Sequence, residues 1–213
     1  MGHVRRLALI ALVLTPHLLS ACAGSDKPVS LAPPKRALKA DDYKRELKRW
    51  TRFTSILRQL DTTLRLHATL RGPAFDAALI AKKTKLFGLD APRVAKLKEA
   101  AQKRASESIS LIVVAATHDI AWNDFDRKSS HWRIFLQNDA GEQLDPLQVK
   151  KLRRITETDR TLLPQLENFF ERYDLSFPRA LPDGRPFIRS DAKQISLHVR
   201  GALGSANLRW ELR

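Results

Sequence analysis

Residues 108–117, with the sequence SISLIVVAAT, decide the fold. The stretch is apolar and rich in β-branched residues, which favour strands over helices. Shorter runs after it alternate apolar and polar residues and are separated by turn residues. These runs predict further strands at 131–137, 147–155, 169–177, 194–200 and 206–212. Six short strands predict an antiparallel β-sandwich, for which an immunoglobulin-like arrangement is one architecture.

The chain before residue 108 has a different, mainly helical pattern. Apolar residues at three- and four-residue spacing predict a helix that begins at Asp41 and Asp42 and continues to about residue 60. Two further helices are predicted at about 73–86 and 92–106. The second of them is capped by Asp90. Leucines and alanine alternate with polar residues in one strand near 62–71, and this strand could join the later sheet. The predicted fold class is α+β, with basic N-terminal helices and a C-terminal sandwich.

The N-terminus has the composition of an export signal. Arg5 and Arg6 precede an apolar stretch, which ends in Leu19-Ser20-Ala21-Cys22. This ending resembles the lipobox of bacterial lipoproteins, in which an apolar residue and two small residues precede an invariant cysteine. Cys22 is also the only cysteine in the chain, so an internal disulfide and a multi-cysteine metal site are excluded.

The lipoprotein resemblance implies a specific maturation. Signal peptidase II would cleave before Cys22, whose sulfur would carry a diacylglyceryl group and whose amine would carry a further acyl chain such as palmitate. Ala23 stands where Asp would signal retention in the inner membrane, so the resemblance implies the outer membrane. The alternative is an ordinary signal peptide cleaved near Ala21 or Ala23, with Cys22 incidental. The mature part loosely resembles uncharacterised envelope lipoproteins, from which no functional residue follows.

The sequence therefore divides into four segments. A signal peptide at 1–21 precedes the lipidated cysteine and a flexible tether at 22–40, which lacks periodicity and holds three prolines. A basic, mainly helical region follows at 41–106, and the sandwich-like domain occupies 107–213.

The net charge of +15 is unevenly distributed. Residues 23–105 carry 20 basic and 8 acidic side chains, whereas residues 106–213 carry 16 and 15. This asymmetry favours contact between the helical part and an anionic surface, either lipid headgroups or acidic polysaccharide. A solvated basic face is the simpler alternative. Nucleic acid fits poorly as a partner of an exported, lipidated protein.

The loop at 118–131 holds the best candidates for chemistry. Two histidines and three aspartates could converge on a cation there, namely His118, Asp119, Asp124, Asp126 and His131. Their spacing matches no known metal motif, and the alternative is that Asp and Asn side chains stabilise turns. We expect no cofactor beyond the covalent lipid.

The same loop offers an interaction site and a hydrolase hypothesis. Trp122 and Phe125 could form an exposed anchor for an envelope protein, unless the loop folds back over the sandwich. Ser129, Ser130 and His131 are adjacent, but no G-x-S-x-G motif accompanies them. The sequence therefore predicts a non-enzymatic binding or structural role in a membrane-anchored envelope lipoprotein. The alternative is a small periplasmic hydrolase or metal-dependent enzyme that uses this loop.

Overall fold

The structure, a computed structural model, describes residues 27–58 and 61–213, so the predicted signal peptide and Cys22 lie outside it. The helices are α1 (Tyr43–Trp50), α2 (Pro73–Phe87), α3 (Ala91–Glu107) and α4 (Glu157–Leu162), with 3-10 turns η1 (Ala40–Asp42) and η2 (Ile120–Trp122). The strands are β1 (Thr51–Arg58), β2 (Asp61–Leu70), β3 (Ser108–Thr117), β4 (Trp132–Asn138), β5 (Gln143–Leu144), β6 (Gln148–Lys151), β7 (Glu171–Pro178), β8 (Gln194–Gly201) and β9 (Gly204–Glu211).

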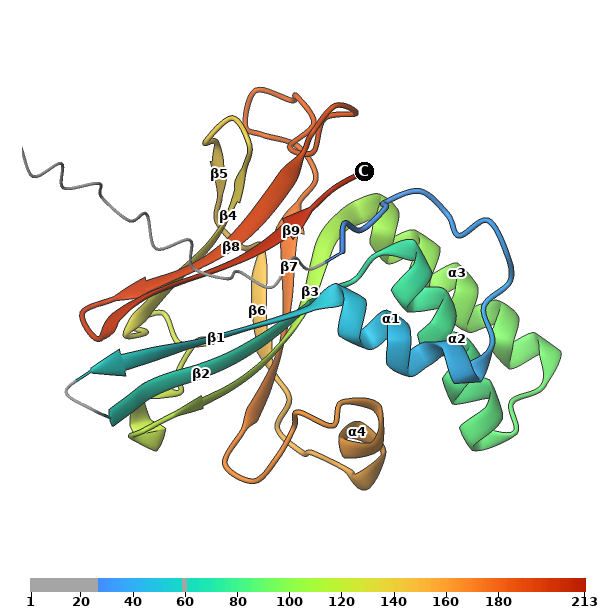
Figure 1. Ribbon diagram of the computed structural model, residues 1–213, viewed down its shortest axis with the longest axis horizontal. Coiled ribbons are helices and arrows are strands. Elements are labelled where there is room, and N and C mark those ends of the chain that lie inside the picture. The colour runs from blue at the N-terminus through green and yellow to red at the C-terminus, as the bar shows by residue number, and fades with distance from the viewer. Residues whose placement is uncertain (1–26, 59–60) are drawn as a thin grey trace, which may run out of the picture.

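Two antiparallel sheets pack against each other, and helices α1, α2 and α3 lie on the far side of one of them (Figure 1). That sheet has the strand order β1-β2-β3-β7-β6, and the other has the order β5-β4-β8-β9. The predicted α+β class with a sandwich-like arrangement is confirmed, whereas an immunoglobulin-like architecture is not. Strands β1 and β2 pair into the same sheet as β3, so the predicted boundary at 106–107 does not separate two sheets.

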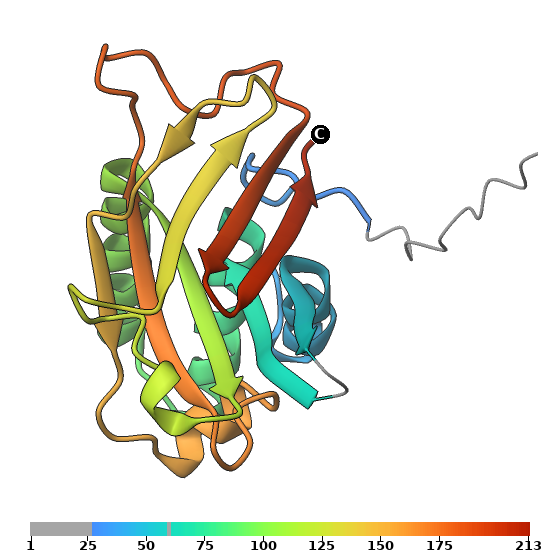
Figure 2. The ribbon, with the colours of Figure 1, turned by 90° about the vertical axis from the view of Figure 1, so that its left-hand side faces the viewer.

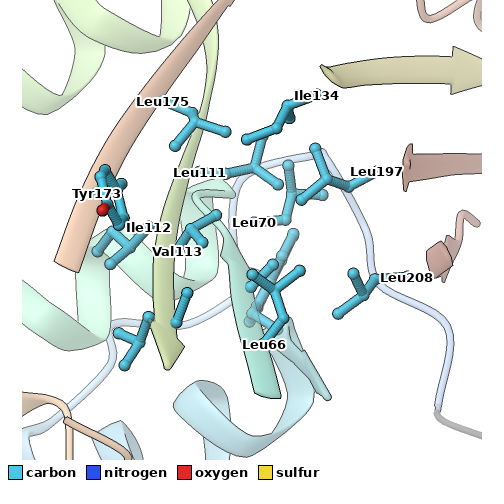
Figure 3. Close-up of a cluster of buried hydrophobic side chains, with 14 of the residues drawn as sticks. Leu66, Leu70, Leu111, Ile112, Val113, Ile134, Tyr173, Leu175, Leu197 and Leu208 are labelled. Atoms are coloured by element: carbon cyan, nitrogen blue, oxygen red, sulfur yellow. The ribbon is translucent and has the colours of Figure 1, made fainter. Parts of the chain in front are cut away.

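Strand β3 lies in the middle of its sheet, and both of its faces are buried. It pairs with β2 on one side and with β7 on the other. Leu111 and Val113 lie on the face of β3 toward the second sheet, where Ile134 and Leu197 lie near Leu111 and Leu208 lies near Leu66 of β2 (Figure 3). Ile112 lies on the opposite face, as the alternation of a strand requires. Burial on both faces explains why this stretch is apolar almost throughout and does not alternate.

The predicted helix from residue 41 to about residue 60 is wrong in its second half. Helix α1 ends at Trp50, and residues Thr51–Arg58 form strand β1, which pairs with β2 from Thr51↔Thr69 to Arg58↔Asp61. Non-local hydrogen bonding to β2 therefore overrides a local spacing that fitted a helix. The other predicted helices are present, and Asp90 caps α3 by accepting a hydrogen bond of 3.0 Å from the backbone of Arg93.

The predicted flexible tether at 22–40 is also corrected over its described part. Val29 is fully buried and forms a parallel bridge with Leu212. Figure 2 shows residues 27–39, hereafter the strap, beginning beside the C-terminal end of β9. Within residues 27–58 and 61–213, no helix combines the length and the apolar composition that crossing a bilayer requires.

Candidate functional site

A large cavity lies between the strap and the two helices α2 and α3. Its volume is about 1110 Å³, slightly above the usual range of small-molecule sites. The strap runs as an open loop from near the C-terminal end of β9 to the start of α1 (Figure 1). Leu31, Pro34 and Leu38 of the strap line the cavity on that side.

Both ends of the strap are fixed by specific contacts. At the first end, the backbone N–H of Val29 donates to the carbonyl of Glu211 at 2.9 Å, and the N–H of Arg213 donates to Val29 at 3.1 Å. At the second end, the Arg36 guanidinium donates two hydrogen bonds, of 2.8 and 2.9 Å, to the carboxylate of Asp42. These two hydrogen bonds, with a further one donated by the Lys39 backbone N–H, hold the pKa of Asp42 well below its usual range.

Helix α2 supplies the cavity floor because it is apolar on two sides. Phe75, Ala78 and Leu79 are buried in the core. Ala77, Ile80 and Ala81 are half-buried and line the cavity instead. Helix α3 contributes Val94 and Ala101 from the facing side, and none of its residues is fully buried. Small side chains on both helices leave the space open.

A buried carboxylate joins the walls of the cavity. Nη2 of Arg71, at the end of β2, lies 2.7 Å from Oδ1 of Asp76 on α2. Nη2 of Arg104 on α3 lies 2.7 Å from Oδ2 of the same side chain. Burial lowers the pKa of Arg71, and the neighbouring Asp76 opposes that shift. One aspartate with two arginines makes this cluster net positive, and Arg71 and Asp76 are its members that line the cavity.

The cavity margin is also basic. Lys35 and Arg36 of the strap, Lys85 of α2 and Lys98 of α3 all line it. Lys85 has an exposed ion pair of 3.2 Å with Asp41, a geometry that contributes little in water. The site therefore combines an apolar interior with an excess of positive charge.

The 118–131 loop does not present the predicted exposed anchor. Phe125 is only 4% exposed and packs between the rings of Trp132 and Tyr173. Trp122 is half-buried, and its backbone carbonyl accepts a hydrogen bond of 2.7 Å from the Trp132 indole. The loop thus folds back onto the sandwich, and its exposed large apolar side chain is Ile120.

The five candidate metal ligands separate into different contacts. His118 pairs with Asp61 of β2 at 3.0 Å, and His131 pairs with Asp124 at 2.9 Å. Asp119 accepts a hydrogen bond of 2.8 Å from the backbone of Ala121 and caps η2. Asp126 is exposed. The part of the chain that the structure describes holds no group of three or more such ligands.

Asp124 and His131 resemble the orienting half of a catalytic triad, but the third member is displaced. Nδ1 of His131 faces the buried Asp124 carboxylate, which suits a base held in place by an acid. The hydroxyl of Ser130, however, donates to Asp124 at 3.0 Å and so contacts the acid and not the base. Asp124 also accepts from the backbone N–H of His131. The arrangement closes a turn before β4.

Comparisons with known proteins give this site no name. No family model and no curated protein matches the chain. One solved structure, a novel protein of unknown function from Burkholderia pseudomallei K96243, is 12% identical over 82% of this chain and 90% of that chain, with a TM-score of 0.42. At that score the similarity assigns neither a fold family nor a function.

Proposed function

We propose that the chain is a lipid-anchored protein of the bacterial cell envelope, in the outer membrane, with a non-enzymatic binding role. The observation that carries the binding role is the apolar cavity under the strap. The 118–131 loop supports an interaction or a metal-dependent reaction less well, because Phe125 is buried and the candidate ligands are apart.

The strap makes the proposed anchor a short one. Seven residue steps separate Cys22 from Val29, which is fixed to β9. A fully extended chain of that length reaches about 25 Å at most. The cavity begins at Leu31, two residues beyond the attachment. A lipidated Cys22 would therefore keep the cavity close to the membrane that holds the anchor.

The exposed basic side chains of the helices favour the same orientation. Lys44, Lys48 and Lys96 are exposed on α1 and α3. Each Lys or Arg near an anionic surface contributes about 1 kcal/mol, which decays within a Debye length. The helical part would therefore rest against anionic lipid headgroups or acidic polysaccharide. The second sheet, which belongs to the nearly neutral segment 106–213, would face away.

Cell fractionation tests the anchor. We expect the wild-type chain to sediment with outer membranes and to incorporate labelled palmitate. The Cys22→Ala variant should do neither, whereas the matched control Ser25→Ala should behave as wild type. Membrane recovery and labelling that survive Cys22→Ala would overturn the lipid anchor.

Vesicle binding tests the orientation. The residues of the core extend from Val29 to Trp210, so a chain that begins at Ala23 keeps the whole core. At low salt we expect it to bind phosphatidylglycerol vesicles and to leave phosphatidylcholine vesicles unbound. Equal binding to both, or to neither, would refute a basic lipid-facing surface.

A further inference from the structure

We infer that the cavity binds a single-chain anionic lipid drawn from the adjoining membrane, with its alkyl chain between α2 and α3 and its headgroup at the basic margin. The inference rests on the proposed binding function and names its ligand. It has three independent supports, namely the shape and lining of the cavity, its charge, and its position along the chain.

The lining suits an alkyl chain. Ala77, Ile80 and Ala81 face Val94 and Ala101 across the space between the two helices. None of these five side chains carries a hydrogen-bonding group, so this part of the lining offers an alkyl chain dispersion contacts and the burial of apolar surface. A volume of about 1110 Å³ exceeds the needs of a small metabolite and accommodates a long chain.

The charge suits an anionic headgroup. Six basic residues and one acidic residue line the cavity. The acidic one, Asp76, is already paired with Arg71 and Arg104. Among the described residues, no carboxylate is paired with Lys35 on the strap or with Lys98 on α3. These two ammonium groups are thus available to a carboxylate or phosphate, and charge complementarity excludes a cationic amphiphile.

The position of the cavity identifies the source of the lipid. The strap that forms one wall is the segment that leads to Cys22. A short anchor holds this wall near the headgroups of the membrane, where a lipid with one chain can leave the bilayer at modest cost. A soluble anionic metabolite would make no use of the apolar interior.

Direct titration tests the ligand class, with the chain that begins at Ala23 and with palmitate as the probe. We expect one site per chain at low salt. Hexadecanol, with the same chain length and no charge, should bind about tenfold more weakly, because it lacks the contact with the lysines. Octanoate should bind more weakly still, since it buries about half as much apolar surface.

Two pairs of adjacent or nearby α3 positions supply matched variants. Ala101→Trp fills the cavity, whereas Ala100→Trp places the same ring on the exposed side of the helix. Lys98→Glu reverses a margin charge, whereas Lys103→Glu reverses an exposed charge of the same helix outside the cavity. We expect Ala101→Trp to abolish palmitate binding and Lys98→Glu to weaken it about tenfold, with both controls unchanged. Circular dichroism would show whether Ala101→Trp unfolds the protein. If it does, Lys98→Glu still tests the inference.

Three results would overturn the inference. They are failure of the wild-type chain to bind palmitate, equal affinity for hexadecanol and palmitate, and equal effects in the paired variants. A fourth concerns the chain's own acyl groups. If the lipidated full chain in nanodiscs binds no added palmitate while the unlipidated chain does, the anchor itself fills the cavity and no membrane lipid enters. Each of these leaves the Cys22→Ala fractionation result unaffected, so failure of the ligand and failure of the anchor are distinguishable.

Discussion

The indole nitrogen of Trp210 donates a hydrogen bond of 2.8 Å to the backbone carbonyl of Trp50, which lies 160 positions earlier in the chain. Trp50 is the last residue of α1 and Trp210 belongs to β9, so the bond ties the end of a helix to the second sheet. Both side chains are almost completely buried. This contact fixes the point at which the chain turns from α1 into β1.

Removing that donor should destabilise the fold. Trp210→Phe leaves the Trp50 carbonyl buried without its partner and opens a small void. We expect a loss of about 2–4 kcal/mol in the free energy of unfolding. Urea titration followed by circular dichroism measures it. Trp122→Phe, at a half-buried position, is the control and should lose less than about 1 kcal/mol. Similar losses in the two variants would contradict the importance of the bond.

The Trp50 ring also requires glycine at position 72. A Cβ atom on Gly72 would overlap Cη2 of Trp50, so the buried ring would have to move. We expect Gly72→Ala to cost about 3 kcal/mol and to change the near-ultraviolet signal of Trp50. Gly88→Ala separates backbone strain from collision, because Gly88 has φ +58° and open space around it. That variant should cost about 1 kcal/mol. A cost for Gly72→Ala no larger than this would mean that the ring yields easily.

The strap clamp at Arg36 and Asp42 should respond to acid in a defined direction. The pKa of Asp42 is lowered in the folded protein, chiefly by the hydrogen bond from Arg36. Its stabilising contribution is therefore complete above the unfolded pKa of about 3.9 and is lost as pH falls through the lower folded value.

Comparison with Asp42→Asn isolates that contribution. Hydrogen exchange of the strap amides should be faster in the variant by a constant factor between about pH 8 and 5, and the difference should shrink below about pH 4. Lys85→Gln, which removes only the exposed pair with Asp41, is the control and should leave exchange unchanged. A difference that grows on acidification would reverse the assigned sign.

The sequence predicts the sheets more successfully than it predicts the strap and the first helix. Strand β3 is recognisable because burial on both faces demands a continuous apolar run, which no solvated segment needs. The end of α1 is not recognisable, because Trp50 and Ile56 fit both a helical stripe and a strand. The decisive contact, with Trp210, is distant in sequence. Val29 and Leu31 are separated by one serine and flanked by prolines. This run is too short for periodicity to indicate that Val29 is docked.

The cavity is harder still to predict. The sequence signal for the cavity is a second apolar set on α2, formed by Ala77, Ile80 and Ala81. A helix with one buried face does not require these additional apolar residues. Small residues there are equally compatible with close helix packing. The strap forms one wall of the cavity, beside α2 and α3. One end of the strap is attached by the bridge between Val29 and Leu212, which are so far apart in the sequence that no local pattern reveals their contact.

The last prediction concerns Asp124 and His131. A structural role and a hydrolase role predict different effects when these residues are replaced. Asp124 is 3% exposed and accepts hydrogen bonds from Ser130 and from His131. Asp124→Ala should therefore cost about 2–4 kcal/mol, since it leaves several donors unpaired. His131→Ala removes a half-exposed ring and should cost about 1 kcal/mol.

Neither variant should change the rate at which p-nitrophenyl esters are cleaved, which we expect to equal the rate in buffer alone. Esterase activity above buffer that His131→Ala and Ser130→Ala both abolish would establish the hydrolase instead. Activity that is lost through unfolding would fall together with stability. The result that decides for a hydrolase is therefore a His131→Ala protein with a near-wild-type urea midpoint and no remaining turnover.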